Sequence, residues 1–237
     1  MCAAQAFASS LEESGAVSRV GRIRVVLYGS LSLTGLGHGT DRAILAGLEG
    51  NVPATVDTDY LLSVRERCAH DGTIHVNGTN AIAYDDDGDM VFDRWKRLAP
   101  HPNGMRFQAF DAQGNIIDEQ VWYSIGGGFI RRGRIDDALI SNHEQTPASS
   151  QSPEDSGNDE AAEYGDGVPY PFVSCDGLID LCRKHHLSIA DVVWANETAR
   201  RSPQEVRDRL TRIWNVMSHC IDAGCASATP TLPGGLD

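Results

Sequence analysis

The sequence predicts an α+β protein, in which an antiparallel sheet carries flanking helices. The first observation is a change of hydrophobic period, because apolar residues recur at helical spacing in the early segments and alternate with period two from Gly72 to Ile130. The second is a polar, acidic stretch at 141–167, after which the apolar patterns are helical. We therefore expect an α+β domain over residues 3–140, a disordered linker over 141–167 and an all-helical segment over 168–237.

The first elements of the α+β domain are a helix over 3–11 and a strand over 22–30. Good helix formers and apolar residues at helical spacing indicate the helix. In the strand, Ile23, Val25 and Leu27 alternate with other residues and share one face. That face is expected to lie in the core.

Two further helices follow a glycine-rich turn. Thr40 is placed to cap the first of them, over 41–48, and Asp41 in its first turn suits the positive end of the helix dipole. The second covers 57–69, and its apolar stripe consists of Tyr60, Leu61, Val64 and Cys68.

The segment from 72 to 130 reads as an antiparallel meander of short strands separated by turns rich in Asn, Gly and Asp. One of these turns holds four aspartates, at 85–87 and 89, which raises the possibility of a calcium loop. No glutamate follows at EF-hand spacing, so an ordinary turn is the better interpretation.

The C-terminal part contains three predicted helices. Ser188 and Asp191 are placed to cap the second, and Ser202 with Glu205 forms a predicted capping box on the third, with Pro203 at its first position. The apolar stripe of the third helix needs further protein to cover it, since three helices in about sixty residues bury little surface. This stripe consists of Val206, Leu210, Ile213, Met217 and Cys220/Ile221.

Charge and composition exclude some classes of function. The chain holds 33 acidic and 20 basic residues, a formal net charge of −13, so it repels a phosphate backbone and is not expected to bind nucleic acid. It has no apolar run long enough to span a bilayer, and its first residues lack the basic region of a signal peptide. These features predict a cytoplasmic protein without a membrane partner.

Six cysteines are present, and without a secretion signal they are expected to be reduced thiols. Cysteines and histidines gather in the C-terminal third, but their spacings match no zinc template well. Cys182 and Cys220 fall on apolar helix positions, so core packing is preferred to metal binding for them. No metal ligand is assigned.

The turn at 35–39 is the segment most suggestive of chemistry. Its three alternating glycines follow a strand and precede a helix, so backbone N–H groups there are suited to a phosphate or a carboxylate, and His38 adds a group able to exchange a proton near neutral pH. The spacing is not that of a dinucleotide fingerprint, and no second parallel strand is expected. A plain turn whose histidine bonds locally carries comparable weight. A second glycine cluster, at 126–128, indicates only a close approach.

Five ordered motifs give the chain a family resemblance. Residues 25–57, 103–110, 122–130, 168–172 and 213–236 together resemble the single-chain bacterial iron–sulfur L-serine dehydratases, or L-serine ammonia-lyases. The resemblance implies a beta-chain-like α+β domain followed by the start of a helical catalytic alpha domain. It implies L-serine as substrate, with pyruvate and ammonia as products.

The resemblance also implies which residues form the site. The family's Gly-His-x-Thr-Asp segment lies in the active site between the two domains, and this gives His38 a catalytic role. Gly37, Gly39, Thr40 and Asp41 become the expected substrate-binding residues. Leu36 and Gly39 differ from residues common in the family, so details of binding are open.

The family carries a [4Fe–4S] cluster, and none of the six cysteines here matches its ligands. The family also continues beyond both ends of this chain. We therefore expect an N-terminal fragment that is inactive alone and whose partner is the missing catalytic domain, in its own downstream sequence or a separate chain. A homodimer is possible. The alternative is a non-catalytic module of α+β type that binds an amino acid or dimerises.

Overall fold

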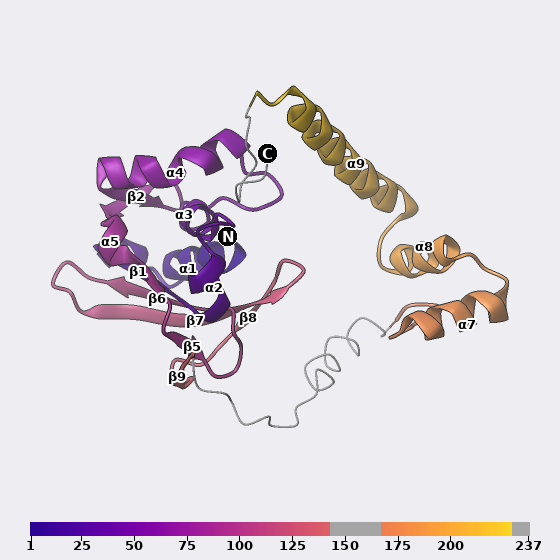
Figure 1. Ribbon diagram of the computed structural model, residues 1–237, viewed down its shortest axis with the longest axis horizontal. Coiled ribbons are helices and arrows are strands. Elements are labelled where there is room, and N and C mark those ends of the chain that lie inside the picture. Colours follow the sequence, from indigo (N-terminus) through magenta and orange to yellow (C-terminus); the bar gives the residue numbers. More distant parts are fainter. Residues whose placement is uncertain (143–166, 229–237) are drawn as a thin grey trace. The chain divides into compact units, whose positions relative to one another are not determined.

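The computed structural model describes residues 1–142 and 167–228. The chain divides into two compact units, Met1–Gln145 and Thr146–Asp237. Figure 1 labels the elements of both units. In the first unit they are α1 (Cys2–Glu13), η1 (Val17–Arg19), β1 (Arg22–Tyr28), α2 (Gly29–Thr34), α3 (Thr40–Leu48), α4 (Thr58–Asp71), β2 (Thr73–Val76), β3 (Asn80–Ala83), α5 (Asp86–Asp89), β4 (Met90–Asp93), β5 (Lys96–Leu98), β6 (Gly104–Phe110), β7 (Ile116–Gly126), β8 (Phe129–Arg132) and β9 (Leu139–Ser141). In the second they are α7 (Cys175–His185), α8 (Ile189–Arg200) and α9 (Pro203–Ala226).

The first unit is built on a mainly antiparallel sheet with the strand order β2-β3-β1-β6-β7-β8. Strands β6, β7 and β8 form an antiparallel meander next to β1. On its other side β1 pairs in parallel with β4, from Val25 opposite Met90 to Tyr28 opposite Asp93, and with β3 at Arg22 opposite Ala83. Strands β3 and β4 therefore follow one another along β1, with the single turn of α5 between them.

Helices α1, α3 and α4 lie on one side of this sheet (Figure 1). Their buried side chains pack on the alternating apolar positions of β1 and β6, as the period-two pattern predicts. Phe7 of α1 stacks on Phe107 of β6, with ring centroids 5.2 Å apart. The main core includes Phe7, Leu11, Ile23, Val25, Leu27, Ile44, Leu45, Leu48, Val64, Cys68, Ile74 and Phe107.

A smaller apolar cluster joins the sheet to the two-stranded sheet of β5 and β9. It consists of Tyr28, Leu98, Val121 and Tyr123, all buried. The mainly antiparallel sheet and its flanking helices confirm the predicted α+β class for the first unit.

Three local predictions for this unit need correction. The strand predicted over 22–30 ends at Tyr28, because Gly29 takes a positive φ of +54° and begins α2. Thr40 is the first residue of α3 and not its cap; Gly39, in the left-handed conformation, is the cap. The segment from 72 to 130 is not wholly a meander, since β3 and β4 run parallel to β1 and a parallel strand does follow the glycine-rich turn.

The second unit is helical. Ser188 and Asp191 form a capping box on α8, whereas on α9 Ser202 accepts the Glu205 N–H but the Glu205 carboxylate bonds to Arg209. The capping box that the spacing predicts on α9 is therefore wrong, and the structure has a capping box on α8.

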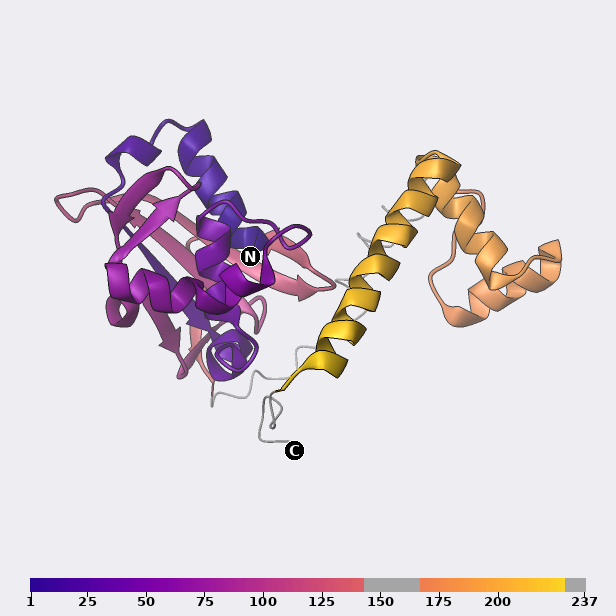
Figure 2. The same ribbon diagram turned by 90° about the horizontal axis from the view of Figure 1, so that it is seen from above.

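Helix α9 is the longest helix of the described residues, with 24 residues, and Figure 2 shows its course. Its apolar stripe is largely exposed, and within the described residues Val206 is the one buried member of the stripe. Cys182 is half-buried and Cys220 is exposed, so the expectation that Cys220 packs in a core is wrong for the structure as described.

Almost all of the predicted linker at 141–167 lies outside the described residues, and the domain boundaries drawn around it remain predictions. Among the residues that the structure describes, no helix is both long and apolar enough to cross a membrane.

Candidate functional site

The glycine-rich turn joins α2 to α3 and is closed by its own backbone. The Gly35 carbonyl oxygen accepts hydrogen bonds from the N–H groups of His38, at 3.2 Å, and Thr40, at 2.9 Å. Gly39 donates to the Leu36 carbonyl at 3.2 Å and has φ +66°, which favours glycine. A Cβ at Gly35 would collide with the Leu31 carbonyl oxygen. The sequence thus needs glycine at both ends of this turn, for two different reasons.

The predicted site residues share this turn but differ in exposure. His38 and Gly37 are exposed, Gly39 and Thr40 are half-buried, and Asp41 is 3% exposed. His38 therefore presents its imidazole to solvent. The first N–H groups of a helix lack carbonyl partners within it, so α3 directs donors towards the same turn. The N–H groups of His38, Gly39 and Thr40 are used within the turn. The arrangement therefore offers the exposed imidazole of His38 beside the positive end of a helix dipole, which favours a small anion.

Asp41 forms an ion pair with an arginine of α4. One carboxylate oxygen of Asp41 accepts a hydrogen bond of 2.5 Å from Arg65 Nη1. The same guanidinium binds Asp86 of α5 through Nη2, at 2.8 Å, and Nε, at 3.1 Å. Tyr84 completes the chain by donating its hydroxyl to Asp86 at 2.7 Å. A row of polar groups, Asp41, Arg65, Asp86 and Tyr84, therefore leads from the turn to the end of β3.

These contacts fix the charge states of the row. The hydrogen bonds from Arg65 hold the pKa of Asp86 below its ordinary value, despite an opposing effect of burial. Burial raises the pKa of Tyr84, and its bond to the Asp86 carboxylate adds to the rise. Asp86 is thus ionised and Tyr84 neutral near neutral pH, so the Arg65–Asp86 pair in the row keeps its charges.

The segment at 85–89, predicted to be an ordinary turn, also binds two arginines of β1. It forms the single helical turn α5, and Asp89, which is 1% exposed, binds Arg22 of β1 at 2.5 Å. Arg24 donates to the Gly88 carbonyl at 3.0 Å. Sequence reasoning missed these pairings because the arginines lie far away along the chain; the only local signal was the density of aspartates.

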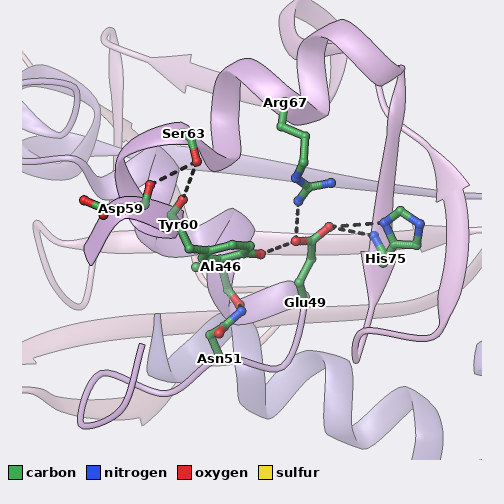
Figure 3. A network of polar contacts seen from close by, with 8 residues as sticks. All are labelled: Ala46, Glu49, Asn51, Asp59, Tyr60, Ser63, Arg67 and His75. Atoms are coloured by element: carbon green, nitrogen blue, oxygen red, sulfur yellow. Dashed lines mark hydrogen bonds and ion pairs between the residues drawn. The ribbon is translucent and has the colours of Figure 1, made fainter. Parts of the chain in front are cut away.

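A second network lies at the other end of α3 (Figure 3). Glu49, whose side chain is 6% exposed, accepts hydrogen bonds from the Tyr60 hydroxyl, from Arg67 Nη2 at 2.5 Å and from the His75 backbone N–H at 2.9 Å. Burial alone would raise the pKa of Glu49, but these three bonds outweigh it and hold the pKa below its ordinary value. The network joins α3 to α4 and β2.

The described residues do not fit the iron–sulfur cluster that the family resemblance implies. No group of three or more His, Cys, Asp or Glu side chains in the described ranges converges on a point where a metal ion could be held. Cys68 is buried among apolar side chains of the main core. No cluster ligand is therefore assigned among the described residues.

Comparison with known proteins gives a consistent result. The family model described as "Serine dehydratase beta chain" matches residues 1–134. The whole chain is 38% identical to an L-serine dehydratase of Streptomyces coelicolor and 35% identical to L-serine dehydratase 1 of Escherichia coli, covering 47% of each. The L-serine dehydratase of Mycobacterium tuberculosis is 33% identical, with 46% covered. The chain thus spans about half the length of the curated relatives it matches.

Proposed function

The chain belongs to the serine dehydratase family through its beta-chain domain, and from this premise we propose that it forms part of an L-serine ammonia-lyase. The observation that carries the proposal is the family match over residues 1–134, a range that includes the glycine-rich turn. The reaction removes the α-proton and the β-hydroxyl of L-serine as water. The resulting aminoacrylate becomes an imine, which is hydrolysed to pyruvate and ammonia.

We assign the substrate-facing role to the turn between α2 and α3. His38 is its exposed proton-exchanging group, because imidazole is a side chain suited to general base chemistry. We assign the carboxylate of the amino acid to Gly37, Gly39 and Thr40 because the N-terminal end of α3 favours an anion through the helix dipole. The N–H groups of Gly39 and Thr40 already bond within the turn, so the dipole, and not these two donors, supports the assignment. Asp41 is buried beside these residues and holds the start of α3 in place.

Activation of the leaving hydroxyl is assigned to the part of the dehydratase that this chain does not span. The chain spans 47% of the Streptomyces coelicolor relative, so about half of the dehydratase lies outside the matched region. The isolated chain is therefore expected to bind L-serine without converting it. Its proposed partner is the remaining half of the enzyme, and a cytoplasmic location and a homodimer stay predictions from the sequence.

The proposal is tested by titrating L-serine into the full chain by calorimetry, in parallel with a pyruvate assay. We expect a heat of binding that the His38→Ala variant loses and the His70→Ala variant keeps. His70 is the matched control because its side chain is 88% exposed and pairs only locally, with Asp71. An absence of binding at millimolar L-serine contradicts the substrate role of the turn. Pyruvate formation by the chain alone, after anaerobic supply of iron and sulfide, contradicts the division of roles.

A further inference from the structure

Helix α4 holds α3 at both ends with two arginines. Arg65 binds Asp41 in the first turn of α3, and Arg67 binds Glu49, the residue that caps its last turn. Both pairs have a nitrogen–oxygen distance of 2.5 Å, and both carboxylates are almost fully buried. The two ion pairs are therefore alike in distance and in the burial of the carboxylate.

Their surroundings make them unequal. Glu49 has two further donors, the Tyr60 hydroxyl and the His75 N–H. Asp41 has none: throughout the described residues, Arg65 is the one group bonded to its side chain, and its second oxygen is buried without a hydrogen-bond partner. A buried carboxylate without a partner is strongly disfavoured, so Asp41 depends on Arg65 in a way that Glu49 does not depend on Arg67.

The loss of Arg65 has a consequence for the turn. An unpaired Asp41 would turn towards water, and because it lies in the first turn of α3 it would take Thr40 and Gly39 with it. Thr40 donates to the Gly35 carbonyl, the same oxygen that the His38 N–H binds. The bonds that shape the turn around His38 are therefore within one residue of the ion pair.

We propose that Arg65 is a positioning residue, which fixes the conformation of the His38 turn by holding Asp41, and that Asp86 orients the guanidinium for this purpose. Within the described residues the hydrogen bonds of Arg65 go to Asp41 and Asp86, so Arg65 acts on the turn through Asp41. The bidentate bond to Asp86 fixes the plane of the guanidinium, so that Nη1 points at Asp41. The inference rests on the proposed function only in taking the turn as the place where L-serine binds.

The test compares Arg65→Met with Arg67→Met in the full chain, at a temperature where circular dichroism shows both to be folded. The readouts are the amide NMR signals of Gly37 and Gly39 and the ring signals of His38, recorded without ligand. Arg65→Met is expected to shift or broaden them. Arg67→Met removes the same side chain from the same helix and is expected to leave them at their wild-type positions. A purely structural role would lower stability in both variants without moving these signals in the folded state.

Ligand binding gives a second readout. If the turn is correctly formed in about a tenth of the Arg65→Met molecules, the dissociation constant for L-serine rises about tenfold. Arg65→Lys keeps a charge near Asp41 but cannot bind Asp41 and Asp86 through one planar fork, so a partial rescue is expected. Should Arg65→Met fail to fold, Asp86→Asn is measured instead, with changes in the same signals at smaller amplitude.

The proposal is overturned if Arg65→Met leaves the turn signals unchanged, or if Arg67→Met moves them as much. The NMR comparison is made without ligand, so it stands even if L-serine binds neither the wild-type chain nor any variant. That last result would count against the proposed function alone.

Discussion

The Glu49 network offers the sharpest test of how this fold is held together. The perturbation is Glu49→Gln, which keeps the shape of the side chain and removes its charge. The glutamate accepts from Tyr60 and Arg67 on one oxygen and from the His75 N–H on the other. An amide has one accepting oxygen, so whichever way it is turned, at least one of these three donors meets its NH₂ group.

The expected loss follows from these contacts. A hydrogen bond to a charged group contributes about 1.5–3 kcal/mol, and the variant loses at least one of them together with the charge of the Arg67 pair. The Arg67 side chain is 33% exposed, so water screens that pair and its part is at the low end. We expect a decrease in the free energy of unfolding of about 2–3 kcal/mol, or about 5–10 °C in Tm.

The assay is urea unfolding at several pH values, followed by far-UV circular dichroism. The pKa of Glu49 is lowered in the folded state from an ordinary value of 4.5. Its contribution is therefore fully present above about pH 4.5 and is lost as the pH falls through the lower folded value. The gap between wild type and variant should be constant from pH 8 to 6 and narrow below about pH 4.5.

The control is Glu66→Gln, an exposed carboxylate on α4, which is expected to change stability by less than about 0.5 kcal/mol. Equal stabilities of wild type and Glu49→Gln at pH 7 would show that the charge of Glu49 and its hydrogen bonds do not stabilise the fold. A gap that persists unchanged in acid would show that shape, and not charge, explains the loss.

Two further outcomes are expected in the first unit. Gly35→Ala should lower the free energy of unfolding by about 1–3 kcal/mol, because the new Cβ would meet the Leu31 carbonyl oxygen. Gly37→Ala is the control, since the nearest atom to a Cβ there lies 3.6 Å away. Urea unfolding of both variants checks this, and equal losses would contradict it. Burial raises the pKa of the Cys68 thiol to about 11. Iodoacetamide at pH 8 should therefore modify the exposed Cys220 and spare Cys68, as measured by peptide mass spectrometry. Equal labelling of the two cysteines would mean that the core around Cys68 opens.

Much of the fold could be predicted because its signals are local. Alternation at 22–28 places Ile23, Val25 and Leu27 in the core, and Ser188 with Asp191 caps α8 as expected. Each of these features depends on residues within a few positions of one another. The same holds for the position of His38, since glycines on both sides of it close a turn whatever lies beyond.

The exact ends of elements were less predictable. Gly29 could have continued β1 or started α2, and Thr40 could have capped α3 or begun it. Backbone conformation at these boundaries depends on what packs nearby: at Gly29 a Cβ would collide with the Pro102 carbonyl oxygen, a group 73 positions away that belongs to another part of the sheet unit. The sequence contains no local trace of that approach.

The sequence alone determined the class of the fold, the position of the glycine-rich turn and the histidine it exposes. Only the tertiary structure decided how that turn is supported: Asp41 on Arg65, Arg65 on Asp86, and Asp89 on Arg22, which lies 67 positions away. Periodicity and capping are short-range effects that a stretch of a few residues carries within itself. A buried ion pair exists only where the folded chain brings two distant charges together and removes water from them.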